Sequence, residues 1–230
     1  MENFELHLNY YLKRFHVLSP DEFEVICKDS KLPPLSKPLL VLTFDDGMEN
    51  NKYVIDLLDK KNIKAYFFVI PSFINSEEPE NYLSTFIRPG YINKNETEPE
   101  DFRPMGWEML KKAEFNGHKI GSHTYSHTLV KEDNEEKSAF EIIQSKKAIE
   151  GNLSIGVPYF CSINNTSLSV GKSQEDLIHQ NYSYHFTTYY GNNFPLPQVY
   201  SLERVNIEAY WHMNEVYFAL GNIRKLLIKK

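Results

Sequence analysis

Two groups of polar residues in the sequence have the types and spacing that metal-dependent hydrolysis needs. The stretch "LTFDDGMEN" at 42–50 places Asp45 and Asp46 directly after a short apolar run. Further along, "GSHTYSH" contains His123 and His127, spaced i, i+4 and so able to share one side of a turn or tight loop. Two neutral imidazoles and one carboxylate form a facial ligand set for a divalent cation, with positions left for water and substrate.

The adjacent carboxylates repel each other unless something offsets the repulsion. Successive side chains of a strand point to opposite sides, so we expect Asp45 and Asp46 to take different roles at one strand end. One would bind the cation and the other would stand beside the attacking water. The cation itself would hold both carboxylates ionised. Gly47 would allow the backbone to turn sharply and leave room above the site.

Alternating strands and helices are predicted to carry these residues. Such alternation is typical of a parallel sheet with right-handed crossovers, in which chemistry gathers at the carboxyl ends of the strands. Both polar groups follow predicted strands, so the fold would bring them together. Strands are predicted at 39–44, 63–70, 118–123, 155–163 and 182–191, and helices at 51–62, 106–117, 135–152 and 173–181, with an earlier helix beginning at Ser19.

Composition and length limit the classes of protein. With 230 residues, 41% hydrophobic, we expect one globular domain spanning 1–230. The net charge of −6 argues against a nucleic-acid partner, and the basic end "IRKLLIKK" is interpreted as a last helix or frayed tail. No apolar run is long enough for a membrane span, and the N-terminus lacks a signal-peptide pattern, so a cytoplasmic location is expected. Cys27 and Cys161 are expected to be buried and unpaired.

A long segment rich in proline, asparagine and glutamate runs from Pro71 to Pro104. A loop of this length in a compact domain is either an excursion near the active site or a mobile surface insertion. We expect the segment to shape specificity.

The motifs resemble a known family. "TFDDG" (43–47) and "SHTYSH" (122–127) look like the first two motifs of the polysaccharide deacetylases, the NodB-homology carbohydrate esterases (carbohydrate esterase family 4-like). The tryptophan-led helix before the histidines, "HFTTYYG" and "SLERVNI" extend the resemblance over roughly 39–207. The resemblance implies a distorted or incomplete (β/α) barrel, an α/β fold, and metal-dependent removal of an N-acyl group, usually N-acetyl, from a sugar.

The family's roles transfer to matching positions. Asp46, His123 and His127 match the metal ligands, and Asp45 matches the general base that activates the water. One divalent metal ion is therefore expected. Zinc is the first choice, and cobalt, manganese and nickel also suit two imidazoles and a carboxylate.

The third motif of the family differs here. The corresponding stretch, "PYFCSINN" (158–165), has Ile163 and Asn165 where a variant of the motif has proline and glycine, and it contains no arginine. Arg204 in "LERVNI" is the best candidate to hold Asp45, with a surface ion pair as the alternative. The family's late histidine has no clear match, although His212 beside Trp211 could face the site.

Four other residues have open assignments. Trp107 could stack on a sugar, or pack its helix. Tyr159 could supply a backbone donor to the oxyanion, as a tyrosine of the third motif does in the family. His179 and His185 are interpreted as structural, the first on an amphipathic helix and the second in the core.

Three functional hypotheses follow. The first is a metal-dependent sugar N-deacetylase acting on an acylated sugar, nucleotide sugar or oligosaccharide, plausible in surface-polysaccharide synthesis. The second is a deformylase or other C–N amidohydrolase with the same site, which pocket size would separate from the first. The third is a catalytically weakened carbohydrate-binding relative, motivated by the altered third motif. The sequence does not fix the oligomeric state.

Overall fold

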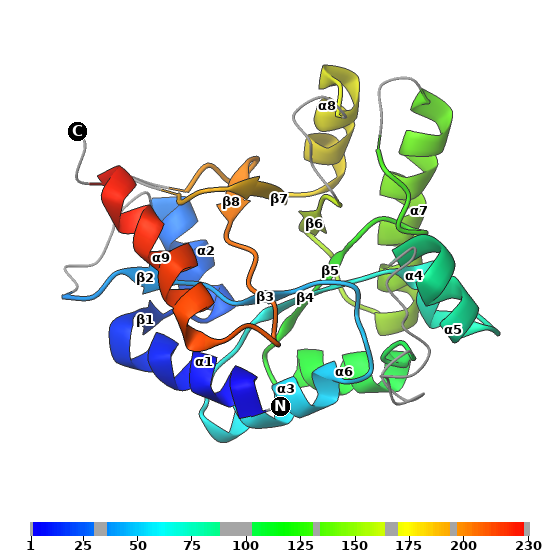
Figure 1. The fold of residues 1–230 in the computed structure, drawn as a ribbon. Coiled ribbons are helices and arrows are strands. Elements are labelled where there is room, and N and C mark those ends of the chain that lie inside the picture. Colours follow the sequence, from blue (N-terminus) through cyan, green and yellow to red (C-terminus); the bar gives the residue numbers. More distant parts are fainter. Residues whose placement is uncertain are drawn as a thin grey trace.

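The computed structural model describes residues 2–29, 36–87, 103–130, 134–163, 170–193 and 197–227, with side chains to residue 221. Within this part of the chain, six parallel strands form one sheet in sequence order from β3 to β8 (Figure 1). The sheet does not close on itself through backbone pairing, because β3 and β8 are its edges. An incomplete (β/α) barrel was predicted, and the structure confirms it. The strands are β3 (Thr43–Phe44), β4 (Tyr66–Val69), β5 (Lys119–Ser122), β6 (Tyr159–Cys161), β7 (Tyr184–Tyr190) and β8 (Leu202–Arg204).

Helices surround the sheet, and the predicted ones are present. Gly117, with φ of +95°, follows the end of the helix that begins at Trp107. The predicted start at Ser19 is confirmed by a capping box, in which the Ser19 amide donates to Glu22 Oε2 at 2.8 Å and the Glu22 amide to Ser19 Oγ at 3.3 Å. The helices are α2 (Pro20–Asp29), α3 (Asn51–Lys60), α6 (Trp107–Phe115), α7 (Glu135–Leu153) and α8 (Lys172–Asn181).

The two ends of the chain add elements. Helix α1 (Glu2–Arg14) was not predicted, whereas α9 (Met213–Leu227) confirms a last helix for the part of the basic C-terminal segment that the structure describes. The two helices pack against each other (Figure 1), with the Tyr10 and Tyr217 rings 4.8 Å apart. Among the helices in the described ranges, none is both long and apolar enough to cross a membrane.

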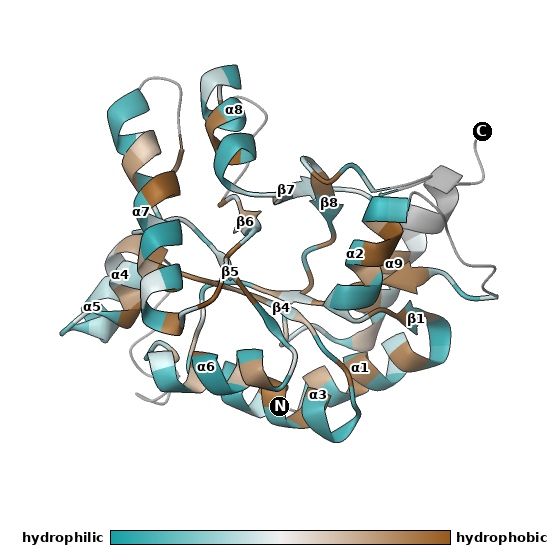
Figure 2. Ribbon diagram, turned by 180° about the vertical axis from the view of Figure 1, so that it is seen from behind, coloured by the Kyte–Doolittle hydropathy of each residue, from teal (hydrophilic) through white to brown (hydrophobic). Residues whose placement is uncertain are grey.

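Both faces of the sheet are buried, as expected for parallel strands. All four residues of β4 are buried, and Figure 2 shows apolar residues concentrated in the central strands and on the inner sides of the helices. Phe67 belongs to the core shared with the outer helices, while Tyr66 and Phe68 belong to a second core that includes residues of α2. The aromatic strand residues therefore fill the fold on both sides of the sheet.

The predicted strand at 39–44 is wrong in one respect, because it is divided. Leu39–Leu40 form β2, which pairs with β1 (His16–Val17) in a separate two-stranded sheet, and only Thr43–Phe44 join the main sheet. The run changes partner at Val41–Leu42. The backbone of Leu40 accepts from Leu18, and that of Leu42 accepts from Tyr66.

The segment 71–104 is not one continuous loop. It begins with α4 (Pro71–Ile74), α5 (Pro79–Tyr82) and the π-helix η1 (Leu83–Ile87), and residues 88–102 lie outside the described part. Pro71 and Pro79 each stand at the start of a short helix, where a missing amide hydrogen has no cost. A small apolar cluster holds these helices in place: Met48, Ile70, Phe73, Leu83 and Ile87.

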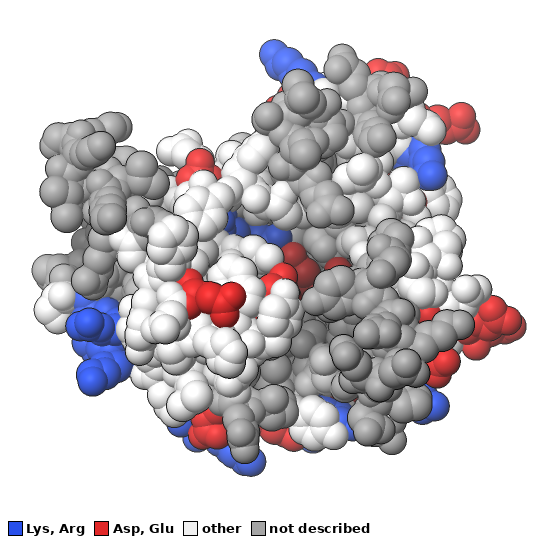
Figure 3. Space-filling view, in the orientation of Figure 1, with Lys and Arg blue, Asp and Glu red and all other residues white. Residues whose placement is uncertain are grey.

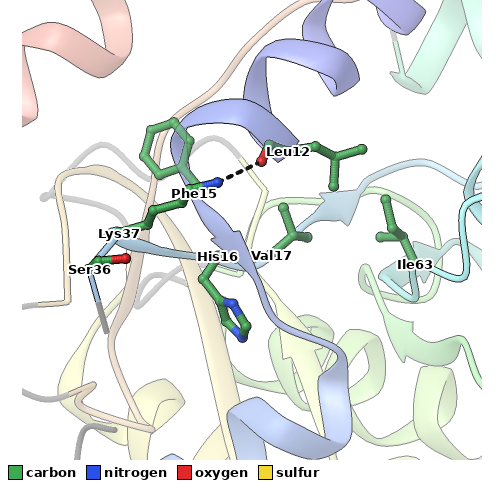
Figure 4. Close-up of a pocket in the computed structure, with 7 residues that line it drawn as sticks. All are labelled: Leu12, Phe15, His16, Val17, Ser36, Lys37 and Ile63. Atoms are coloured by element: carbon green, nitrogen blue, oxygen red, sulfur yellow. Dashed lines mark hydrogen bonds between the residues drawn. The ribbon is translucent and has the colours of Figure 1, made fainter. Parts of the chain in front are cut away.

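One cavity lies at the end of α1 and is lined mainly by apolar groups. Its volume is about 380 Å³, and Lys37 closes one side by donating from Nζ to the Leu12 carbonyl at 3.2 Å (Figure 4). The lining contains no carboxylate, so this cavity is not a candidate metal site; it consists of Leu12, Phe15, His16, Val17, Ser36, Lys37 and Ile63.

Candidate metal centre and active site

The aspartate pair lies in a turn at the carboxyl end of β3. The predicted alternation of a strand does not separate the two side chains, because the strand ends at Phe44. Instead, Asp46 and Gly47 both have φ of +70°, and this left-handed turn directs the two carboxylates apart. Aspartate tolerates this conformation better than most residues, and glycine needs no Cβ space there.

Gly47 is required by space as well as by conformation. A Cβ at this position would lie 2.9 Å from Val69 Cγ1. We expect Gly47→Ala to lower the free energy of unfolding by about 1–3 kcal/mol, measured by chemical denaturation, because left-handed strain and overpacking add. Gly151→Ala is the matched control: a Cβ there meets nothing within 4 Å inside α7, so stability should hold or rise. Equal losses in both variants would contradict the argument.

Three donor atoms converge beside this turn. Asp46 Oδ1 lies 3.5 Å from His123 Nε2 and 3.5 Å from His127 Nε2, and all three side chains are at most 15% exposed. Ligands at about 2.0–2.2 Å from one tetrahedral ion lie about 3.3–3.5 Å from each other, so these separations fit a single divalent cation. The two imidazoles and the carboxylate predicted from the sequence are therefore brought together.

The second nitrogen of each imidazole is also engaged. His123 Nδ1 lies 3.0 Å from the carbonyl oxygen of Cys161, and His127 Nδ1 lies 3.0 Å from that of Phe86. A carbonyl can only accept, so each Nδ1 carries the hydrogen and each Nε2 presents its lone pair toward Asp46. Burial and the neighbouring His123 lower the pKa of His127, which favours the neutral, ligating form. The chemistry of this donor set fits a divalent metal ion.

The histidine loop is not helical, and α7 fixes its shape. Thr124 and His127 have φ of 66° and 58°, an uncommon conformation for both residue types. Glu141, 2% exposed, receives hydrogen bonds from the Ser126 amide at 2.7 Å and from Ser126 Oγ at 2.5 Å. The sequence analysis missed Glu141. Its signal was a polar row, Ser138, Glu141 and Ser145, at helical spacing on the buried side of α7.

Asp45 is held on the other side of the turn by Arg204. The guanidinium donates from Nη1 to Oδ1 and from Nη2 to Oδ2, both at 2.8 Å, and also donates to the Thr187 carbonyl and Thr43 Oγ1. Burial alone would raise the pKa of Asp45, but the Arg204 charge lowers it to about 2. Arg204 is the last residue of β8 and Asp45 directly follows β3, so this ion pair links the two edge strands of the sheet.

Cys161 completes the surroundings of Asp45. Its Sγ lies 3.8 Å from both Asp45 carboxylate oxygens, and burial raises the pKa of the thiol well above its usual value. Both cysteines are free, as predicted, but the expectation that both are buried is wrong for Cys27, which is half-buried. Cys161 is buried, and it contacts a carboxylate rather than only apolar neighbours. It comes from the altered third motif, in which Ile163 is buried and Asn165 lies outside the described residues.

The remaining predicted site residues lie elsewhere. Trp107 packs at the start of α6 and donates to Asn75 Oδ1 at 2.9 Å, in line with the helix-packing alternative. Tyr159 is the first residue of β6, before the carboxyl end, and its hydroxyl bonds Glu24 of α2. His212 is exposed at the start of α9, where its amide donates to Glu215. Its role as the family's late histidine stays a prediction.

Figure 3 shows one face of the molecule, on which a small group of basic and acidic atoms is recessed near the centre. Most other charged side chains in this view lie toward the periphery. The face is therefore not a continuous basic surface of the kind that tracks phosphates.

Comparison with known proteins places the chain in a family. The sequence model described as "Polysaccharide deacetylase" matches residues 33–168, more than half of the chain. The chain belongs to the polysaccharide deacetylase family. A peptidoglycan-N-acetylglucosamine deacetylase of Bacillus cereus is 28% identical over 118 residues, 50% of this chain. Those residues make up 32% of that relative, so the match spans about a third of its length.

Solved structures show the same fold. IcaB from Ammonifex degensii aligns with a TM-score of 0.67 at 18% identity, over 90% of this chain and 83% of its own. The deacetylase PplD of Streptococcus pyogenes, in complex with acetate, aligns with a TM-score of 0.63 at 18% identity, over 89% and 79%. At these identities the likeness concerns the fold, and it agrees with the curled parallel sheet and its peripheral helices.

Proposed function

We propose that this polysaccharide deacetylase relative hydrolyses the N-acetyl amide of an amino sugar, using one divalent metal ion held by Asp46, His123 and His127. The observation that carries the proposal is the convergence of three oriented donor atoms beside a second, ionised carboxylate. The family and the Bacillus cereus relative support an acetylated sugar as substrate. Zinc is the ion that best fits two imidazoles with one carboxylate.

When bound, the ion supplies Lewis-acid polarisation of the amide carbonyl and a water of lowered pKa. The residues of the chain supply the proton transfers and the geometry. His123 Nε2 lies 3.9 Å from Asp45 Oδ2, so the Asp45 carboxylate stands next to the ligand set without belonging to it. Asp45 accepts the proton of the attacking water, and it can then return a proton to the leaving nitrogen.

Arg204 has two effects on this base. Its two hydrogen bonds fix the orientation of the Asp45 carboxylate, and its charge keeps Asp45 ionised at neutral pH. A carboxylate with a pKa of about 2 is a weak base. Proton transfer from the water to Asp45 therefore depends on a lowered pKa of that water. The proposed mechanism therefore depends on the metal and on Asp45 together.

The proposal is tested by metal content and acetate release. We expect His123→Ala to lose one equivalent of divalent metal and to release no acetate from N-acetylglucosamine oligomers or peptidoglycan fragments. His16→Ala, at an exposed position on β1, is the control and should retain both. Release of formate from N-formyl sugars in preference to acetate would redirect the proposal to a deformylase. Bound metal without release of either acid would favour a carbohydrate-binding role.

A further inference from the structure

A second pair of histidines lies outside this site, between α8 and β7. His179, in the last turn of α8, and His185, on β7, line a cavity of about 450 Å³. Their ring centroids are 5.9 Å apart with an interplanar angle of 57°. The ring centroids of the metal-ligating candidates His123 and His127 are 5.3 Å apart, also with an interplanar angle of 57°. The two pairs of rings therefore have nearly the same relative geometry.

Each histidine of the second pair has a buried nitrogen with no hydrogen-bond partner among the described residues. These atoms are Nε2 of His179 and Nδ1 of His185, and His185 is only 4% exposed. Buried polar atoms without partners are rare because each carries an uncompensated desolvation cost. Both atoms belong to residues that line one cavity, which points to a ligand that completes the site.

The rest of each ring is arranged as in a metal-binding imidazole. His185 Nε2 lies 2.6 Å from Ser162 Oγ, where either atom can be the donor, and the ring also lies beside the Tyr200 backbone. In the tautomer whose Nε2–H donates to Ser162, the lone pair is on Nδ1, as metal binding requires. Burial and the neighbouring His179 lower the pKa of His185 to about 3, so the ring is neutral at physiological pH. The His179 ring is stacked on Tyr200 at 4.3 Å, which fixes its orientation.

A carboxylate and a helix end favour a cation here. Glu175 lines the same cavity and lies four residues before His179, on the same side of α8. The carbonyl end of a helix is electronegative, and His179 lies in that last turn. Within the described part of the chain, these three donor atoms are not all within 4.8 Å of one another, so metal binding requires a rearrangement of these side chains, of which Glu175 is exposed.

We propose that His179 and His185, with Glu175, form a second site for a divalent transition-metal ion that ties α8 to β7. Imidazole-rich sites with one carboxylate suit zinc, nickel, cobalt and copper. The ion would be structural, because His185 lies on the side of β7 that packs against His179 of α8. The catalytic proposal does not depend on it.

The test measures metal binding with the first site removed. In His123→Ala/His127→Ala, titration with Zn²⁺ should show one saturable equivalent and a rise in the melting temperature. With Cu²⁺ as the probe, electron paramagnetic resonance should show coupling to two nitrogens. Adding His179→Ala to this background should abolish the saturable equivalent, and adding Ser162→Ala should weaken binding by roughly 10- to 100-fold.

The controls separate folding from binding. His179→Ala alone should keep its circular dichroism and its acetate release, since His179 does not contact the first site. If His179→Ala fails to fold, His179→Gln provides the second variant on the same site. The absence of saturable Zn²⁺ binding in His123→Ala/His127→Ala, or binding unchanged by His179→Ala, would overturn the proposal. The pair would then be a buried aromatic contact, with His185 close to the Tyr200 backbone.

Discussion

Asp45→Asn is expected to lower the rate of acetate release by about 10²- to 10⁴-fold while the protein keeps its metal, because the variant loses the proton acceptor but no ligand. Asp45 Oδ2 lies 3.9 Å from His123 Nε2, whereas Asp46 Oδ1 lies 3.5 Å from both histidines. The measurement is steady-state acetate release, together with metal content by atomic spectroscopy on the same sample.

The Asp45→Asn result needs a control for stability, because the substitution leaves the Arg204 charge without its anion. Activity should therefore be measured well below the melting temperature of the variant. Asp56→Asn, at an exposed position on α3, is the matched substitution and should change neither activity nor metal content. Loss of metal in Asp45→Asn would show that Asp45 is a ligand, and retained turnover would show that another group is the base.

Arg204→Met is expected to lower the free energy of unfolding by about 3–5 kcal/mol, because it leaves a partly buried carboxylate without its partner. Side chains of Arg204 and Asp45 are 16% and 30% exposed, and the Thr187 carbonyl loses its donor as well. Lys111→Ala is the control: its ion pair with Glu108 is exposed, so removal should cost at most about 1 kcal/mol. Chemical denaturation measures both.

Arg204→Met is also expected to change how stability and activity depend on pH. Folding lowers the pKa of Asp45 from 3.8 to about 2, so its contribution to stability is present above pH 3.8 and is lost as the pH falls toward about 2. In Arg204→Met burial dominates and the pKa of Asp45 rises, so that the acid limb of activity should move to higher pH. Denaturation and acetate release across the acid range measure the two effects.

A double-variant cycle separates the ion pair from general disruption. Asp45→Asn/Arg204→Met removes both charges, and it should be more stable than Arg204→Met alone if the unpaired carboxylate causes the loss. Additive losses in the double variant would mean that the two residues do not stabilise each other, in spite of the two 2.8 Å contacts.

Local sequence signals predicted most of the elements and the ligand set. The amphipathic helices have strong helical periodicity, and the buried strand at 63–70 is continuously apolar. Both patterns lie within a short stretch of sequence and can be recognised there. His123, His127 and Asp46 were found because their residue types and their place after strands indicate metal chemistry. The parallel sheet followed from the alternation of these elements, since crossovers have one favoured hand.

Tertiary structure decided what depends on distant partners. The run at 39–44 is uniformly apolar, so the sequence could not show that its two ends pair with different sheets. Short helices after Pro71 form because they share a small apolar cluster, and their packing brings the Phe86 carbonyl to His127.

The sequence by itself determined which residues could bind a metal and which strands would present them, because these properties depend on side-chain chemistry and on the local spacing of apolar residues. Only the tertiary structure decided how the aspartates divide their roles. A left-handed turn at Asp46, rather than strand alternation, separates them. Arg204 reaches Asp45 across the open edges of the sheet, and Glu141 reaches the histidine loop from α7. These contacts join residues far apart in the chain. The sequence had named Arg204 as the residue to hold Asp45, but no local pattern specifies its two-point contact or the role of Glu141.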